Sequence, residues 1–220
     1  ATALGSDNHN LVFRVKPGAT FTLAPANALG ASAGSTATVV VERGGTLAIV
    51  NSAALNGAVT VEAGGRLLAN NAVGLNGTGA LTFEPGSILD ITAATGFSGP
   101  QAAAAAIEPG VIVRLNVGSF GSGVEALDAY LGAKAPVYEI YGADRAAAMP
   151  VSSGTTVMTL SRGTNGLGGM LVNDLASRSL TAAANGKIVI GPNGGVMAAT
   201  TNMTLTVAQG IEFGTNELVI

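Results

Sequence analysis

A nine-residue pattern that returns five times in the first half of the chain constrains the fold more than any other feature. Each copy begins with an apolar residue, has glycine at its fourth position, and carries apolar residues at its seventh and ninth positions. The copies occupy residues 15–23, 41–49, 61–69, 83–91 and 107–115. Their starts are separated by the length of one coil in a stacked β-solenoid, so the pattern predicts that architecture.

The pattern predicts three columns of inward-facing side chains, because strand residues two positions apart share a face. The first column holds Val15, Val41, Val61, Phe83 and Ile107. The second holds Phe21, Leu47, Leu67, Leu89 and Val113, and the third holds Leu23, Ile49, Ala69, Ile91 and Leu115. The repeated glycine predicts a corner with positive φ or close backbone approach.

The remainder of the chain follows the pattern less well. The nine-residue pattern fades after Asn116, and the apolar spacing over 124–131 predicts a short amphipathic helix. Strand signals return from Lys187 onward. The predicted fold class is therefore all-β, a right-handed parallel β-helix (β-solenoid) with an irregular insertion containing a short helix. We expect solenoid coils over 1–117, an insertion or lateral subdomain over 118–180, and resumed solenoid strands over 181–220.

Composition narrows the function classes. The ten basic residues are scattered and the formal net charge is −3, which argues against a nucleic-acid partner. The absence of cysteine excludes thiolate metal sites and disulfides. No apolar run reaches the roughly 18 residues that a membrane-spanning helix needs, so we expect no transmembrane segment in this chain. No catalytic constellation is evident, and we expect neither an enzyme nor a bound cofactor.

The repeated residues carry a resemblance to a known family. Val41–Leu47 and Val61–Leu67 share the form Val-Glu-x-Gly-Gly-x-Leu, and the turn Leu55-Asn56-Gly57 recurs one coil later as Leu75-Asn76-Gly77. In these features the chain resembles the passenger domains of bacterial autotransporters. Those are pertactin-like β-helices exported through an outer-membrane barrel. The resemblance covers about 11–117 and more weakly 181–220.

That resemblance implies a secreted protein at the bacterial cell surface, outside the outer membrane, with an adhesive role. Its partners would be host or neighbouring-cell surface molecules, or copies of itself. The chain has neither an Arg-Gly-Asp tripeptide nor the Gly-Asp-Ser-Gly motif of passenger proteases. Adhesion is thus an expectation from the resemblance alone.

One column of like charges is the candidate metal site. Glutamate occupies the second position of four copies, at Glu42, Glu62, Glu84 and Glu108. On adjacent coils, carboxylates about 5 Å apart could be bridged by Ca²⁺, which accepts several carboxylate oxygens. The simpler interpretation is a solvated edge whose weak repulsion is relieved by Arg43 and Arg66.

Other charged residues have structural interpretations. Asp90 and Arg114 share position eight of consecutive copies, which predicts an outward ion pair. Asp128, Glu125, Glu139 and Asp144 could supply a carboxylate pair for glycoside cleavage, although surface charge on a helix and loops explains them more simply. His9 is the only histidine and has no nearby residues that would make it a metal ligand or a triad member.

Three functional hypotheses follow from the sequence. The first is an extracellular, non-enzymatic β-helical protein that displays loops to a partner, with Tyr130, Tyr138 and Tyr141 as the predicted contact residues. The second is a subunit that assembles with itself into a surface layer or filament. The third is a carbohydrate-active β-helix of the tailspike or lyase type, which the absence of tryptophan for sugar stacking disfavours.

Overall fold

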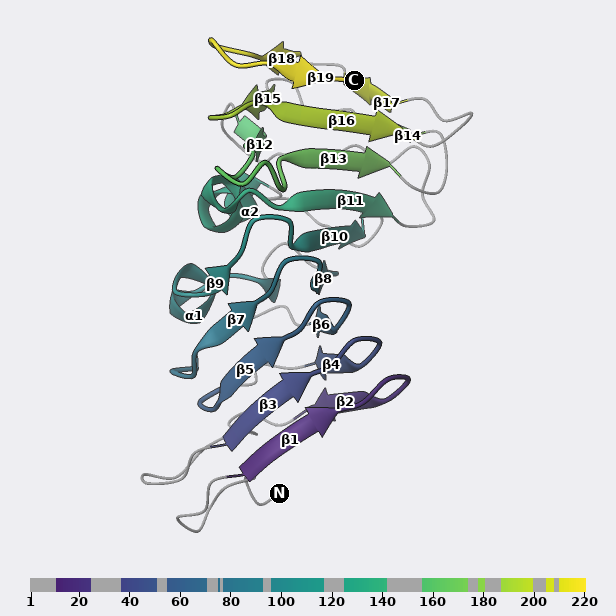
Figure 1. The fold of residues 1–220 in the computed structure, drawn as a ribbon, viewed down its shortest axis with the longest axis vertical. Coiled ribbons are helices and arrows are strands. Elements are labelled where there is room, and N and C mark those ends of the chain that lie inside the picture. Colours follow the sequence, from purple (N-terminus) through teal and green to yellow (C-terminus); the bar gives the residue numbers. More distant parts are fainter. Residues whose placement is uncertain are drawn as a thin grey trace. The chain divides into compact units, whose positions relative to one another are not determined.

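The computed structural model shows stacked coils of parallel strands with a few short helices (Figure 1). The predicted all-β, β-helical fold class is confirmed. The chain divides into two compact units, Ala1–Ile107 and Glu108–Ile220. The structure describes residues 11–24, 37–50, 55–70, 75, 77–92, 96–116, 125–141, 156–173, 178–180, 187–199, 205–207 and 210–220.

Two parallel sheets build the first unit. One sheet has the order β1 (Leu11–Val15), β3 (Ala37–Val41), β5 (Ala58–Val61), β7 (Leu81–Phe83) and β9 (Ala106–Ile107). The other runs in the order β2 (Thr20–Leu23), β4 (Thr46–Ile49), β6 (Arg66–Ala69) and β8 (Ile88–Ile91). Each of the first four coils therefore places one strand in each sheet, as the nine-residue pattern predicts.

The strand registers of this unit confirm the predicted columns. Val15 pairs with Val41, Val41 with Val61, Val61 with Phe83 and Phe83 with Ile107. Leu47 pairs with Leu67 and Leu67 with Leu89, and the third column follows the same register from Leu23 to Ile91. The members are buried, apart from Phe21 on the first coil, which is half-buried. Burial of these apolar side chains is the main stabilising contribution to the stack.

A short corner of constant length joins the two strands of each coil in this unit, over 16–19, 42–45, 62–65 and 84–87. Its glycine has a φ of 76° to 77° at Gly18, Gly44, Gly64 and Gly86. The amide of each of the first three donates to the carbonyl of the glycine on the next coil, at 2.8–2.9 Å. A left-handed backbone that also forms this ladder explains why glycine recurs at the fourth position of the pattern.

The connections that close each coil have no such uniform length. They run over 24–36, 50–57, 70–80 and 92–105, so the second is the shortest and the last is the longest. The last contains the helix α1 (Pro100–Ala103). Leu55, Leu75 and Phe97, one from each of the last three connections, are fully buried. Phe97 also meets Phe83 edge-on, with ring centroids 6.3 Å apart.

The described residues of the second unit form three groups of parallel strands. One sheet runs in the order β10 (Ile112–Asn116), β11 (Val137–Tyr141), β13 (Met170–Asn173), β16 (Gly195–Ala199) and β19 (Leu218–Val219). A second has the order β12 (Thr156–Leu160), β15 (Lys187–Ile190) and β18 (Ile211–Glu212), and a third pairs β14 (Arg178–Leu180) with β17 (Leu205–Val207). The helices are α2 (Glu125–Leu131) and the 3-10 turn η2 (Gly132–Lys134).

This unit departs from the predicted lateral subdomain over 118–180. The short helix is present as α2, but β11 and β13 are rungs of the main sheet, because Val113 pairs with Tyr138 and Tyr138 with Leu171. The corner before β11 lacks the glycine that marks the repeat, whereas Gly110 and Gly194 keep a positive φ at other corners of this unit. Ala135 takes the left-handed conformation, with φ of 52°, and its carbonyl accepts the amide of Gly110. The solenoid therefore continues through the described strands of this stretch.

Candidate functional site

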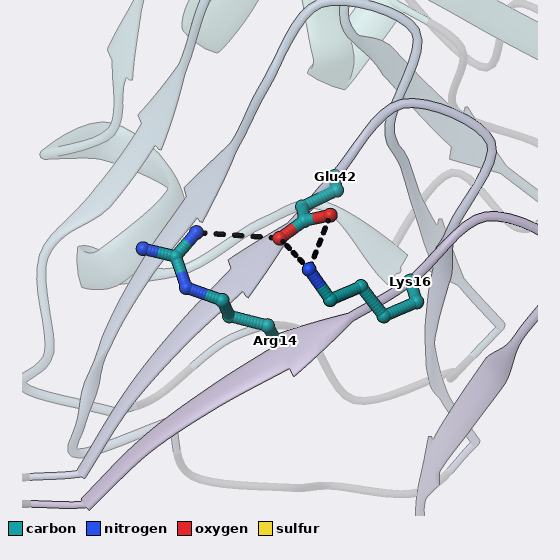
Figure 2. A network of polar contacts seen from close by, with 3 residues as sticks. All are labelled: Arg14, Lys16 and Glu42. Atoms are coloured by element: carbon teal, nitrogen blue, oxygen red, sulfur yellow. Dashed lines mark hydrogen bonds and ion pairs between the residues drawn. The ribbon is translucent and has the colours of Figure 1, made fainter.

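The first charged cluster joins the first coil to the second, beside their glycine corners (Figure 2). Lys16 Nζ lies 2.8 Å from Glu42 Oε1 and 3.1 Å from its Oε2, and Arg14 Nη1 lies 3.3 Å from Oε1. Both cations are on the first coil and the carboxylate is on the second. Lys16 stands at the second position of the pattern, where the later copies have glutamate. It thus holds the first carboxylate of the predicted column.

The other predicted metal ligands take the same corner position on their coils. Glu62 is half-buried, and Glu84 and Glu108 are exposed. Glu84 Oε2 accepts a hydrogen bond from the Ala63 amide at 3.4 Å, so it contacts the preceding coil. Arg43 lies over the glycine corner of the following coil, since a Cβ placed on Gly64 would lie 2.8 Å from Arg43 Cγ. Among the described residues, no group of three or more His, Cys, Asp or Glu side chains is arranged to hold a metal ion.

The Lys16–Glu42 contact carries a testable pH dependence. The hydrogen bond from Lys16 lowers the pKa of Glu42 below its ordinary value, with Arg14 adding to the effect and desolvation opposing it. Because the folded-state pKa is depressed, Glu42 stabilises the fold above its unfolded pKa, and this contribution is lost as pH falls through the folded value. We expect Lys16→Met to raise the pKa of the Glu42 carboxyl, measured by carbon-13 NMR titration.

The matched control is Lys187→Met. Lys187 also forms a surface ion pair, with Glu212 at 3.1 Å, but in the second unit. This variant should leave the titration of Glu42 unchanged. A Glu42 carboxyl that titrates identically in Lys16→Met and in the original chain would contradict the assignment of Lys16 as the main cause of the lowered pKa.

Asp90 is the most deeply buried charge among the described residues. Its side chain is 0% exposed, and Arg66 Nη2 of the preceding coil lies 2.5 Å from its Oδ2. Asp90 is therefore buried, although it alternates along β8 with the inward-facing Leu89 and Ile91, and its predicted outward pair with Arg114 stays a prediction. Arg66 does not relieve the repulsion within the glutamate column, because its guanidinium binds this aspartate on the next strand of the same sheet. Buried pairs of this kind are costly to break by removing one partner.

Arg114 forms a second charged contact between adjacent strands. Its Nη2 lies 3.1 Å from Glu139 Oε1 on β11, and its Cζ lies 4.5 Å from the centroid of the Tyr141 ring. Arg114 and Glu139 are directly paired in the register of β10 and β11. Glu139 is therefore held by a cation on the neighbouring rung, which is a structural use of that carboxylate.

The predicted contact tyrosines do not form one exposed surface. Tyr138 is 2% exposed, so it belongs to the core and the prediction that it contacts a partner is wrong. Burial raises the pKa of its hydroxyl above the ordinary value, and the nearby negative charge of Asp128 adds to this. Tyr130 and Tyr141 are half-buried, and their role in contacting a partner stays a prediction.

Asp128 joins the helix α2 to a strand. Its Oδ1 accepts the Thr159 amide at 2.7 Å, and its Oδ2 accepts the Thr159 hydroxyl at 2.9 Å. Both carboxylate oxygens thus bind the same residue of β12. His9 and Asp144 lie outside the described residues, as does the side chain of Glu125. The described members of the predicted glycoside-cleaving set, Asp128 and Glu139, bind Thr159 and Arg114 respectively.

Sequence reasoning missed the buried polar residue that ties several coils together. Gln101 is 4% exposed and lies on α1. Its amide nitrogen donates to the carbonyls of Leu55 and Gly79 at 2.7 Å, and its amide oxygen accepts the Gly77 amide at 3.1 Å. All these partners are backbone groups, so no pattern of side-chain types marks them. The only signal is a polar residue between proline and a run of alanines.

Comparisons with known proteins add no relative to this description. No family model, curated protein or solved structure matches the chain. In the part of the chain that the structure describes, no helix is long and apolar enough to cross a membrane.

Proposed function

We propose that this chain is a β-solenoid scaffold of the autotransporter-passenger type, secreted to a bacterial cell surface, where it presents the connections between its coils to a partner. The partner would be a molecule on a host cell or a neighbouring cell. The proposal assigns no chemical step to the chain.

The observation that carries the proposal is the contrast between the two ends of each coil in the first unit. The glycine corner keeps a constant length, and its backbone ladder fixes the spacing of the coils. The connection at the other end changes in length, from its shortest over 50–57 to its longest over 92–105, while the columns stay in register. A scaffold with constant rungs and variable connections is suited to recognition, because connections tolerate changes that the core does not.

The engaged charges support the same interpretation. The carboxylates of Glu42, Asp90 and Asp128 each bind a cation or a hydrogen-bond donor of the scaffold. These residues hold coils and elements together. Recognition would then depend on the connections more than on the charged residues along the strands.

Location is the first test. In cells that produce the chain, a protease added outside intact cells should digest it, while a cytoplasmic marker remains whole. A chain that resists the protease until the cells are broken would contradict the proposed surface location.

Binding is the second test, made with the purified chain labelled with a fluorophore and intact bacterial or epithelial cells. Replacing the connection residues 25–34 with a Gly/Ser sequence of equal length should reduce cell-bound fluorescence. The control variant Thr60→Ser changes an outward strand residue and should bind as the original chain does. Equal binding by the connection variant and the original chain would contradict display by this connection.

A further inference from the structure

The loop between β12 and β13, residues 161–169, holds an asparagine side chain against its own backbone. Leu167 donates its amide to Asn165 Oδ1 at 3.0 Å. A Cβ placed on Gly163 would lie 2.7 Å from the same oxygen, so the side chain folds over the loop although Asn165 is exposed. Backbone bonds close the loop, from the Gly163 amide to the Leu167 carbonyl at 2.8 Å and from the Gly166 amide to the Gly163 carbonyl at 2.9 Å. Asn165 is thus held in one orientation beside the glycine that follows it.

This orientation brings two reactive groups together. The hydrogen bond from Leu167 to Asn165 Oδ1 closes a ring of atoms that also contains Asn165 Cγ and the Gly166 nitrogen. A backbone nitrogen can attack the side-chain carbonyl carbon of the asparagine before it, and glycine leaves this approach open because it has no Cβ. An attack within one held segment needs no encounter between separate molecules. The loop therefore keeps a nucleophile and an electrophile within the same turn.

The Leu167 amide also matches the charge change of such an attack. When the Gly166 nitrogen bonds to Asn165 Cγ, the electron pair of the carbonyl π bond moves to Oδ1, which becomes an oxyanion. An N–H group already directed at that oxygen stabilises the charge as it develops. Asn165 Nδ2 makes no hydrogen bond to any described residue, so the scaffold does not hold the nitrogen that must leave.

We propose that Asn165 is a modification site that reacts without an enzyme. The Gly166 nitrogen attacks Asn165 Cγ, so that a new N–Cγ bond forms and the Cγ–Nδ2 bond breaks. Nδ2 leaves as ammonia, and the hydrogen that it gains is supplied, by way of solvent, by the Gly166 amide. The product is a five-membered succinimide ring. Water then opens this ring at either of its two carbonyl carbons, which gives aspartate or isoaspartate at position 165.

Asn193 and Gly194 form the same dipeptide but make a contrasting contact. Asn193 is also exposed, and the Gly194 amide donates to the Gly191 carbonyl at 3.2 Å, a bond of the same span as the one in the Asn165 loop. The Asn193 side chain, however, is held through its nitrogen, because Nδ2 donates to the Arg162 carbonyl at 3.0 Å. The nitrogen that would leave is therefore bound, and the reaction would lose this hydrogen bond.

Asn56 and Gly57 are the remaining Asn-Gly pair of which the structure describes both residues. Asn56 Oδ1 accepts the amide and the hydroxyl of Thr78, at 3.2 Å and 3.3 Å. These bonds tie the side chain to a different coil, so they close no ring like that of Asn165. Asn165 should therefore react first of the three.

The modification changes the charge of an exposed loop. Aspartate places a carboxylate where the amide was neutral, and isoaspartate also lengthens the backbone by one methylene group. Arg162 Nη2 donates to the Gly166 carbonyl at 3.0 Å, so a cation of the same loop lies near the new charge. The charge of this loop would thus depend on the age of the molecule.

Peptide mapping by mass spectrometry tests the proposal on the full chain. The folded chain is kept in a slightly alkaline buffer, and the conversion of each asparagine is followed with time. One hydrogen bond that favours the transition state changes a rate by about tenfold, so we expect Asn165 to convert about tenfold faster than Asn193. In urea the chain loses both contacts, and the two rates should become similar. This comparison needs no variant.

Two variants of Leu167 test the contact to the oxyanion. Leu167→Pro removes the amide that binds Asn165 Oδ1, so it should slow the conversion of Asn165 by about tenfold. Leu167→Ala is the matched control, because it keeps this amide and should convert at the rate of the original chain. Both variants should keep the circular dichroism of the original chain, and the rate at Asn193 should be unchanged in both.

Three results would overturn the proposal. The first is an equal rate of conversion at Asn165 and Asn193 in the folded chain. The second is a product that contains aspartate but no isoaspartate, because direct hydrolysis of the side-chain amide forms no ring. The third is an unchanged rate at Asn165 in Leu167→Pro. The proposed display function does not depend on these results, because the location and cell-binding tests do not measure the chemistry of this loop.

Discussion

Replacing Gly79 with alanine is expected to destabilise the first unit more than alanine at any other glycine of this unit whose neighbours the structure describes. A Cβ at this position would overlap the carbonyl oxygen of Gly57, lie 2.5 Å from the Gly57 carbonyl carbon, and lie 2.6 Å from the Leu55 carbonyl oxygen. All three atoms belong to the backbone of the neighbouring coil, so no side chain can move aside. We expect a loss of about 4 kcal/mol in the free energy of unfolding, which lowers the melting temperature by about 8–16 °C.

Gly18→Ala is the matched control for this prediction. Gly18 has a φ of 76°, but among the described residues no atom beyond its chain neighbours lies within 4 Å of an added Cβ. Its cost is therefore backbone strain alone, about 1–2 kcal/mol. Calorimetry gives the melting temperature of both variants. The loss in Gly79→Ala reports the steric overlap between coils, and the loss in Gly18→Ala reports backbone strain at the corner. Equal melting temperatures for the two variants would contradict the proximity argument.

The second large effect is expected for Gln101→Leu. Leucine has a similar volume but makes no hydrogen bond to the Gly77 amide or to the carbonyls of Leu55 and Gly79. The Leu55 carbonyl still accepts the Gly79 amide at 2.8 Å, so two backbone groups lose a described partner. Each buried group left unsatisfied costs about 1–3 kcal/mol, so we expect the two groups to lower the free energy of unfolding in urea by about 2–6 kcal/mol.

A second side-chain amide on the same corner is the control for Gln101. Asn56 Oδ1 accepts the Thr78 amide at 3.2 Å and the Thr78 hydroxyl at 3.3 Å, in an exposed position. Water can replace these bonds, so Asn56→Ala should cost less than about 1 kcal/mol. Hydrogen exchange at the Gly77 amide should become faster in Gln101→Leu and remain slow in Asn56→Ala. A Gln101→Leu chain as stable as the original would refute the assigned role.

The contrast between Gln101 and the apolar columns explains what the sequence could predict. Val41, Val61 and Phe83 occupy the same position on successive coils, so their residue type and their spacing are enough to predict the fold from the sequence. Gln101 has no counterpart in the repeat, and its backbone partners Leu55 and Gly79 belong to coils remote from it in the sequence. Nothing in its own sequence neighbourhood identifies those partners, so the role of a buried amide becomes visible only when the coils are stacked.

The second unit is harder to predict for a related reason. Ala135 replaces the expected glycine at a left-handed position, and the consecutive rungs that start at Val137 and Met170 are farther apart in the sequence than any two consecutive coils of the first unit. A search for glycine at the spacing of the first unit therefore finds neither the corner at Ala135 nor the rung that begins at Met170. The surface position expected for Tyr138 fails similarly, because its pairing with Val113 and Leu171 puts it in an inward column. To predict which residues can form a site, one must know which side chains face outward. The pattern specifies this direction only where the repeat is regular.

The glycine ladder also has a mechanical consequence for the first unit. The amides of Gly18, Gly44 and Gly64 all point along the stacking direction, so a pulling force in that direction loads the hydrogen bonds between two coils end-on. These bonds then break one after another, as in unzipping, and each coil releases its length separately. The coil from Val61 to Phe83 would lengthen the tether by about 75 Å at full extension. Under tension this unit would act as an extensible series of small steps.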